Sequence, residues 1–229
     1  MIVENLLNLI FPPVCGFCGN FSSDFLCNAC RENLLKKSVC RVKEYKNNSF
    51  YFSDHFYLFN YEAEVRNKII QYKFQDRSYL YKSFARLFIE SPVFAKFIKN
   101  YSCIIPVPIH KKRLKSRGYN QSELIAHEIS LYFNIPLYKS VLIKNKNIVA
   151  QSTLDKLHRE LNIRGAFSIN SNYSLAGNAD SLQKIAIFDD IFTTGATANE
   201  CAKILSNEFS PTKIRNCYYC KRLINKGTF

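Results

Sequence analysis

The chain has 229 residues, of which 47% are apolar, and a formal net charge of +14. This composition excludes a disordered chain, because it supplies enough apolar side chains for one substantial core with a small unit beside it. The apolar run at residues 6–11 is too short to span a bilayer and follows Glu4 rather than a cation, so it predicts neither a membrane span nor a secretory signal. We therefore expect a cytoplasmic protein.

In chain order, the patterns begin with a short apolar helix that ends at Pro12-Pro13. A four-cysteine segment follows, then a polar stretch, then an aromatic strand near residues 56–61. Helical spacing of apolar residues predicts helices from residue 62 onward, at 80–89, at 122–133 and at 198–205, and short apolar runs predict strands at 103–108, 185–188 and 213–222. Strands that alternate with helices at this spacing predict an α/β fold with a mostly parallel sheet flanked by helices.

These patterns also predict three units. Residues 1–37 form a four-cysteine zinc module, residues 38–55 form a linker whose loosest point is Asn47-Asn48-Ser49, and residues 56–229 form the main domain.

The N-terminal cysteines form two Cys-x-x-Cys pairs with eight residues between them: Cys15, Cys18, Cys27 and Cys30. Four thiolates at this spacing can surround one ion tetrahedrally and leave no position for water, which is typical of a structural zinc site. Buried thiols or redox-active thiols are the alternatives. A disulfide framework is disfavoured, because the chain is large and shows no export signal.

A cluster of basic residues lies between residues 111 and 117, without an acidic residue among them. Its members are Lys111, Lys112, Arg113, Lys115 and Arg117, and Tyr119 follows closely. Such a segment favours a polyanionic partner, and it could follow the backbone of a single-stranded nucleic acid while Tyr119 stacks on a base. It could also close as a lid over a phosphorylated ligand, or form an ordinary solvated surface.

The most specific pattern spans residues 185–197. An apolar strand delivers Asp189 and Asp190 to its carboxyl end, where open α/β sheets bind ligands. The loop that follows can turn its backbone N–H groups around a phosphate at the start of a helix; it consists of Thr193, Thr194, Gly195, Ala196 and Thr197. The two carboxylates suit ribose hydroxyls, either directly or through Mg²⁺. The plain alternative is a helix cap and nothing more.

This segment resembles the phosphoribosyl-pyrophosphate (PRPP) signature of type I phosphoribosyltransferases. The resemblance implies a type I phosphoribosyltransferase-like fold in which the two aspartates bind the ribose hydroxyls and residues 193–197 hold the 5′-phosphate. It also implies that Lys73 lies in a pyrophosphate-binding loop, where its ammonium group would offset ligand charge. An ordinary surface lysine is the alternative.

Several further motifs occur in the order of the ComF competence family, which the chain is similar to over nearly its whole length. They are Phe11-Pro12-Pro13-x-Cys15, Tyr72-Lys73, Ile105-Pro106-Val107-Pro108, Arg117-Gly118-Tyr119-Asn120-Gln121, Gln151-Ser152 and Arg164-Gly165-Ala166-Phe167. Thr153 departs from the family pattern, which usually has Gly there. The resemblance implies a zinc module, a phosphoribosyltransferase-like domain and a role in natural transformation.

The function we expect is therefore PRPP binding in natural transformation, with handling of imported single-stranded DNA and contact with other DNA-uptake or recombination proteins. The alternatives are an enzyme that transfers phosphoribosyl to an acceptor, and a zinc-organised adaptor. Transfer chemistry of this kind needs positioning and electrostatics rather than a nucleophile, so the sequence assigns no catalytic residue.

Overall fold

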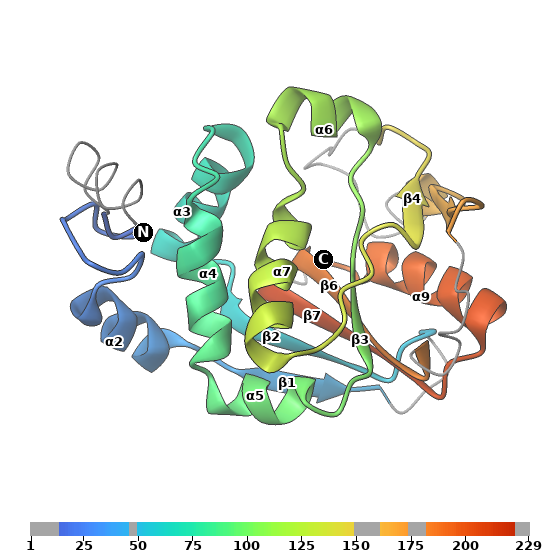
Figure 1. The fold of residues 1–229 in the computed structure, drawn as a ribbon, viewed down its shortest axis with the longest axis horizontal. Coiled ribbons are helices and arrows are strands. Elements are labelled where there is room, and N and C mark those ends of the chain that lie inside the picture. Colours follow the sequence, from blue (N-terminus) through green and yellow to red (C-terminus); the bar gives the residue numbers. More distant parts are fainter. Residues whose placement is uncertain (1–13, 46–49, 149–160, 174–181, 223–229) are drawn as a thin grey trace, which may run out of the picture.

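The computed structural model describes residues 14–45, 50–148, 161–173 and 182–222. The elements are shown in Figure 1. Along the chain they are α2 (Asn28–Lys37), β1 (Arg41–Glu44), β2 (Asp54–Asn60), α3 (Ala63–Phe74), α4 (Leu80–Ile89), α5 (Pro92–Ile98), β3 (Cys103–Pro106), α6 (Lys111–Arg117), α7 (Gln121–Phe133), β4 (Leu142–Lys144), β5 (Phe167–Ile169), β6 (Lys184–Phe192), α9 (Ala196–Phe209) and β7 (Lys213–Lys221).

The central sheet has five strands in the order β1-β2-β7-β6-β3. Strands β2, β7, β6 and β3 are parallel to one another, and only the edge strand β1 is antiparallel to its neighbour. All four parallel strands therefore end at the same edge of the sheet, which is where an α/β protein places its ligand site.

Helices cover both faces of this sheet (Figure 1). Phe84, Phe88 and Ile129 belong to a buried cluster formed by α3, α4, α5, α7 and one face of the sheet. Ala198 and Leu205 of α9 belong to a second cluster, which packs with the small antiparallel pair β4–β5 against the other face. The predicted α/β fold, with a mostly parallel sheet flanked by helices, is confirmed.

Local patterns located most of the elements. The predicted helix at 80–89 coincides with α4, and the predicted strand at 185–188 lies inside β6, which is longer and contains both aspartates. The apolar run stops at Phe188, but ladder pairing with β7 continues to Phe192. Helix α5 was missed. Its N-terminal cap is nevertheless legible in the sequence, because Ser91 accepts from the Phe94 N–H at 3.2 Å and Pro92 follows.

Part of the predicted linker belongs to the sheet. Residues 41–44 lie within the segment 38–55 and form β1, which pairs with β2 in the register Arg41↔Tyr57. Four consecutive exposed side chains hide this strand from a search for alternating apolar residues. The helix expected before residue 13, the tripeptide at 47–49 and the motifs at 11–13 and 151–153 lie outside the described residues.

Candidate functional site: a pocket at the carboxyl end of the sheet

A pocket of about 250 Å³ opens where β3 and β6 part. Strand β3 ends at Pro106, whereas β6 continues to Phe192, so within the described residues no strand pairs with the last residues of β6 on that side. Asp189 and Asp190 line the pocket from this free stretch. The predicted position of the acidic pair, at the carboxyl end of a central parallel strand, agrees with the structure.

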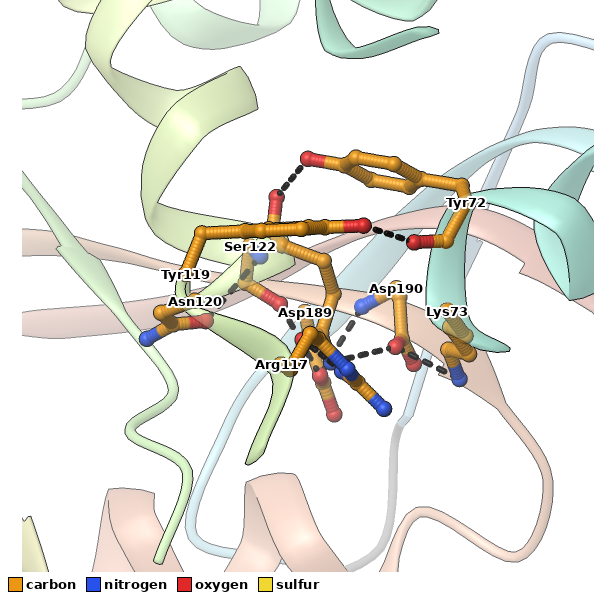
Figure 2. A network of polar contacts seen from close by, with 9 residues as sticks. Tyr72, Lys73, Arg117, Tyr119, Asn120, Ser122, Asp189 and Asp190 are labelled. Carbon is orange, nitrogen blue, oxygen red and sulfur yellow. Dashed lines mark hydrogen bonds and ion pairs between the residues drawn. The ribbon is translucent and has the colours of Figure 1, made fainter. Parts of the chain in front are cut away.

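Asp190 is the more heavily engaged carboxylate of the pair. Its Oδ2 atom lies 2.6 Å from Lys73 Nζ, and the two side chains are only 13% and 17% exposed. The same oxygen accepts a hydrogen bond from Gln121 Nε2 at 2.8 Å. Figure 2 shows Lys73 reaching Asp190 from the end of α3. Lys73 also lines the pocket. The resemblance implied that it lies in a pyrophosphate-binding loop.

Asp189 lies in a different environment, although it is the next residue. Its Oδ1 accepts from the Asp190 backbone N–H at 2.8 Å and from Ser122 Oγ at 3.4 Å. Burial and the neighbouring Asp190 charge together raise the pKa of Asp189 to about 7. Burial acts on Asp190 too, but Lys73 and Gln121 outweigh it and hold the pKa of Asp190 below its ordinary value. Only one of the two carboxylates is thus firmly ionised near neutral pH.

A polar network connects this pair to the segment after α6 (Figure 2). Arg117 donates to Gln121 Oε1, and Gln121 Nε2 donates to Asp190 Oδ2. Tyr72 donates to the Gln121 carbonyl at 2.9 Å, and Tyr119 donates to the Tyr72 carbonyl. Gln121 starts α7. From the sequence, its side chain could bond to base edges or phosphates of a nucleic acid. Its contacts make it the link between Arg117 and Asp190.

The turn from β6 into α9 approaches its surroundings closely at Gly195. This residue has φ +82°, in the left-handed region, and a Cβ atom added there would lie 2.9 Å from the Phe192 ring and 3.3 Å from the Phe50 ring. Glycine is therefore required at this position for two reasons: the positive φ angle, and the lack of room for a Cβ atom between the two rings.

The threonines of this turn divide between two tasks. Thr194 is buried, and its Oγ1 accepts from the Ala196 N–H at 3.3 Å, which supports the start of α9. Thr193 and Thr197 line the pocket instead. The predicted loop is thus folded at the mouth of the pocket, with the N-terminus of a helix of 14 residues directly behind it.

Three further cations line the pocket: Arg113, Lys144 and Arg222. Burial lowers the pKa of Lys144, and the charge of Asp189 partly restores it. The sequence did not single out Lys144 or Arg222. A signal for Lys144 existed, because it ends the apolar run 141–143 as a lone cation, but only the fold brings β4 to the aspartates.

The five cations of the predicted basic cluster lie on two different faces of α6. Lys111, Lys112 and Lys115 are exposed. Arg113 instead lines the pocket and donates to the Ile148 carbonyl at 2.9 Å, and Arg117 contacts Gln121 and lies 5.5 Å from the centre of the Phe74 ring. Two of the five cations are therefore committed to the pocket side.

Tyr119 is also held by the protein. Its ring stacks on Tyr72 with a centroid distance of 5.5 Å. His110 is the N-cap of α6, and its Nδ1 accepts from the Lys112 N–H at 3.2 Å.

The four N-terminal cysteines form a compact cluster. The sulfur atoms of Cys15, Cys18, Cys27 and Cys30 all lie within 4.8 Å of one another. The distance between Cys18 Sγ and Cys27 Sγ is 3.8 Å, and a tetrahedral zinc with Zn–S bonds of about 2.3 Å requires sulfur separations of about 3.8 Å. The residues therefore fit a structural zinc ion.

Comparison with known proteins agrees with this reading. Residues 6–44 match the model of the double zinc ribbon domain. The chain is 29% identical to competence protein F of Haemophilus influenzae over 197 residues, which is 84% of this chain and 78% of that protein. It is 28% identical to competence protein ComFC of Streptococcus pneumoniae and 26% identical to DNA utilization protein YhgH of Escherichia coli K12. These alignments cover 60% and 63% of the two relatives, respectively.

The fold and the cysteine cluster define an α/β protein with a mostly parallel sheet and an N-terminal zinc ribbon. Within that class, the chain is a homologue of competence protein F and ComFC, so the resemblance to the ComF competence family is confirmed. Among the described residues, no helix has both the length and the apolarity needed to cross a membrane.

Proposed function

We propose that the pocket binds PRPP together with Mg²⁺ and that the protein uses this site in DNA uptake. One observation carries the proposal: an acidic pair, a glycine-containing turn at a helix N-terminus, and several cations all line one small cavity. A ligand with a diol at one end and phosphates around it matches this distribution of charge. The names of the relatives, competence protein and DNA utilization protein, support the biological setting.

Each group has a task in this proposal. Asp189 and Asp190 accept from the ribose hydroxyls, and the backbone N–H groups of residues 193–197 hold the 5′-phosphate. Lys73 and Lys144 then offset the charge of the pyrophosphate. Mg²⁺, when bound, would supply an oxygen-coordinated charge that joins the ligand to the carboxylates. Because Lys73 already pairs with Asp190, it needs only to share its ammonium group between that carboxylate and the ligand.

The sequence shows no segment recognisable as a hood for an acceptor nucleobase, which favours ligand binding over transfer to a second substrate. We infer a cytoplasmic protein that binds or senses PRPP. Release of pyrophosphate on addition of nucleobases would support the transferase alternative instead.

Calorimetry with PRPP and Mg²⁺ tests the site. Asp189→Ala combined with Asp190→Ala should abolish binding, while thermal unfolding shows that the fold persists. Glu44→Ala combined with Glu208→Ala is the matched control, because it removes the same charge from exposed positions outside the pocket. The proposal fails if the aspartate variant binds as tightly as the control.

The exposed face of α6 is our first candidate for contact with single-stranded DNA. Changing Lys111, Lys112 and Lys115 to Ala should make the slope of log K against log salt shallower by roughly 2.1, from about 0.7 per phosphate contact on a single strand. PRPP binding should stay intact, because none of these lysines lines the pocket. Loss of PRPP binding in this variant would show that the segment serves the ligand instead. Contact with other DNA-uptake proteins stays part of the proposal.

A further inference from the structure

A second basic cluster lies on the side of the sheet away from α6. Arg41 and Lys43, two residues apart on β1, project to the same face of the strand, and both are exposed. Lys221, at the end of β7, lies over the ring of Tyr57, which pairs with Arg41 across the β1–β2 ladder. Burial, and then the charges of Lys43 and Arg41, lower the pKa of Lys221. We refer to Arg41, Lys43 and Lys221 as the β1–β7 patch.

Aromatic rings underlie this patch. Lys43 Nζ lies 5.6 Å from the centre of the Tyr45 ring, and Lys221 Nζ lies 5.3 Å from that of Tyr57 and 6.0 Å from that of Phe192. These contacts hold the ammonium groups without neutralising them. Among the residues that the structure describes, none of the three cations has a carboxylate partner within ion-pair distance. The three positive charges therefore repel one another in the free protein, which an anion would relieve.

Protection of an exposed sheet edge explains only part of this arrangement. Edge strands often carry Lys or Arg to discourage pairing with other chains, and this accounts for Arg41 and Lys43. It does not account for Lys221, because β7 lies between β2 and β6 inside the sheet. The carbonyl of Lys221 accepts from the Tyr61 N–H at 2.9 Å, and Tyr61 and Arg222 both line the ligand pocket. The patch is thus continuous with the rim of the pocket.

An exposed aromatic side chain extends the same surface. Tyr51 is 49% exposed, and Lys203 Nζ lies 6.0 Å from the centre of its ring. The ring of Phe50, the residue before Tyr51, packs on Tyr45 at a centroid distance of 4.6 Å, and Lys43 lies over the Tyr45 ring. These contacts connect Tyr51 to the β1–β7 patch. Cations interleaved with an accessible aromatic ring are the features with which proteins bind single-stranded nucleic acids regardless of sequence.

We propose that the β1–β7 patch binds the phosphates of single-stranded DNA, with Tyr51 as a stacking platform for a base, and that the strand continues past Arg222 across the mouth of the pocket toward α6. The inference rests on the proposed function for the choice of single-stranded DNA as ligand. It differs in assigning a second surface, on the opposite rim of the pocket from α6.

The test measures binding of a fluorescent oligothymidylate by the full-length, zinc-loaded protein at several salt concentrations. The triple variant should have a slope of log K against log salt that is shallower by roughly 2.1, at about 0.7 per phosphate contact. It carries Arg41→Gln, Lys43→Gln and Lys221→Gln. The matched control changes Lys36, Lys96 and Lys99 to Gln, which removes three exposed charges from α2 and the α5 region. Its slope should stay within error of the wild type.

The outcomes separate this inference from the proposed function. An unchanged slope in the patch variant, an equal change in the control variant, or no binding of the oligonucleotide by the wild type at low salt would each overturn it. PRPP calorimetry on the same variants, and the α6 triple variant, report on the proposed function independently. If Lys221→Gln lowers thermal stability, the double variant Arg41→Gln/Lys43→Gln keeps the test, with an expected change of roughly 1.4.

The stacking role of Tyr51 has its own control. Tyr51→Ala should weaken binding of the oligonucleotide by roughly 5- to 150-fold, since stacking contributes about 1–3 kcal/mol per base. Tyr51→Phe should bind like the wild type, because it keeps the ring. Equal weakening in both variants would contradict the stacking role.

Discussion

At the scale of single residues, the two neighbouring aspartates differ more than their chemistry suggests. From the sequence, we expect both to be ionised. The structure gives Asp190 the contacts with Lys73 and Gln121 and leaves Asp189 with a backbone N–H and a hydroxyl. As a result, the pKa of Asp189 is raised to about 7 and that of Asp190 is lowered. Near neutral pH, Asp189 therefore exchanges its proton readily, whereas Asp190 stays ionised.

The raised pKa of Asp189 predicts a pH-dependent stability of the free protein. The folded state holds the Asp189 proton more tightly than the unfolded chain, so this group contributes stability at about pH 4 that is lost as the pH rises toward about 7. Asp189→Asn keeps the shape of the side chain and abolishes the titration. In urea unfolding, the free energy of unfolding of the variant should rise relative to that of the wild type by at most about 1.4 kcal/mol per pH unit across this window. Above the window, the difference should stay constant. A difference that does not change with pH would contradict the prediction.

At the scale of elements, the turn from β6 into α9 is supported by a segment far away in the sequence. The Tyr51 N–H donates to Asn199 Oδ1 at 2.7 Å, and the Phe50 ring lies beside Gly195. Asn199 itself belongs to the first turn of α9, where its N–H donates to the Gly195 carbonyl at 2.8 Å. The segment before β2 thus braces the start of α9 from outside the pocket.

Removing this brace should loosen the loop without touching the ligand. Asn199→Ala should cost about 1 kcal/mol of folding free energy, the typical net contribution of one hydrogen bond, and it should weaken PRPP binding several-fold. Asn199→Asp retains the acceptor oxygen and should restore most of the folding free energy and most of the PRPP affinity. Urea unfolding and calorimetry are the measurements. Equal PRPP affinity in the wild type and the Ala variant would show that the loop holds its conformation without this contact.

At the scale of the whole molecule, the zinc ribbon shares the core of the α/β domain. Cys15 is 1% exposed and lies in the same buried cluster as Tyr72 of α3. The Phe17 ring packs on Phe84 at a centroid distance of 5.7 Å. Ser83 Oγ donates to the Phe25 carbonyl at 2.6 Å. The same helix α3 carries Lys73 into the pocket, so zinc and pocket are joined through one core.

This packing predicts that loss of zinc destabilises the whole chain. The sequence alone suggests that the main domain survives when the cysteine module unfolds. With the shared core, a chelator or Cys30→Ser should instead lower the midpoint of a single cooperative unfolding transition, and added zinc should reverse the effect of the chelator. Structural zinc sites contribute on the order of 10 kcal/mol to small domains. Cys40→Ser is the control, since Cys40 lies outside the cluster. Two separate transitions, the later one unchanged, would contradict the prediction.

The sequence by itself determined those features in which the chemistry is local. The two Cys-x-x-Cys pairs, the strand that ends in Asp189 and Asp190, and the turn at Gly195 are each contained in a few consecutive residues, so their spacing is legible without a fold. The helix at 80–89 is legible for the same reason, because one face of it is apolar. These local patterns were enough for the fold class and for the centre of the candidate site.

Only the tertiary structure decided which side chains share a space. Lys144 and Arg222 reach the pocket because β4 and β7 end near it, and neither stands in a motif. Whether Arg113 faces the pocket or the solvent depends on how α6 is oriented against the rest of the fold. The different protonation of Asp189 and Asp190 depends on Lys73, which lies more than a hundred residues away in the chain. Distances and burial control these properties, and a chain acquires both only when it packs.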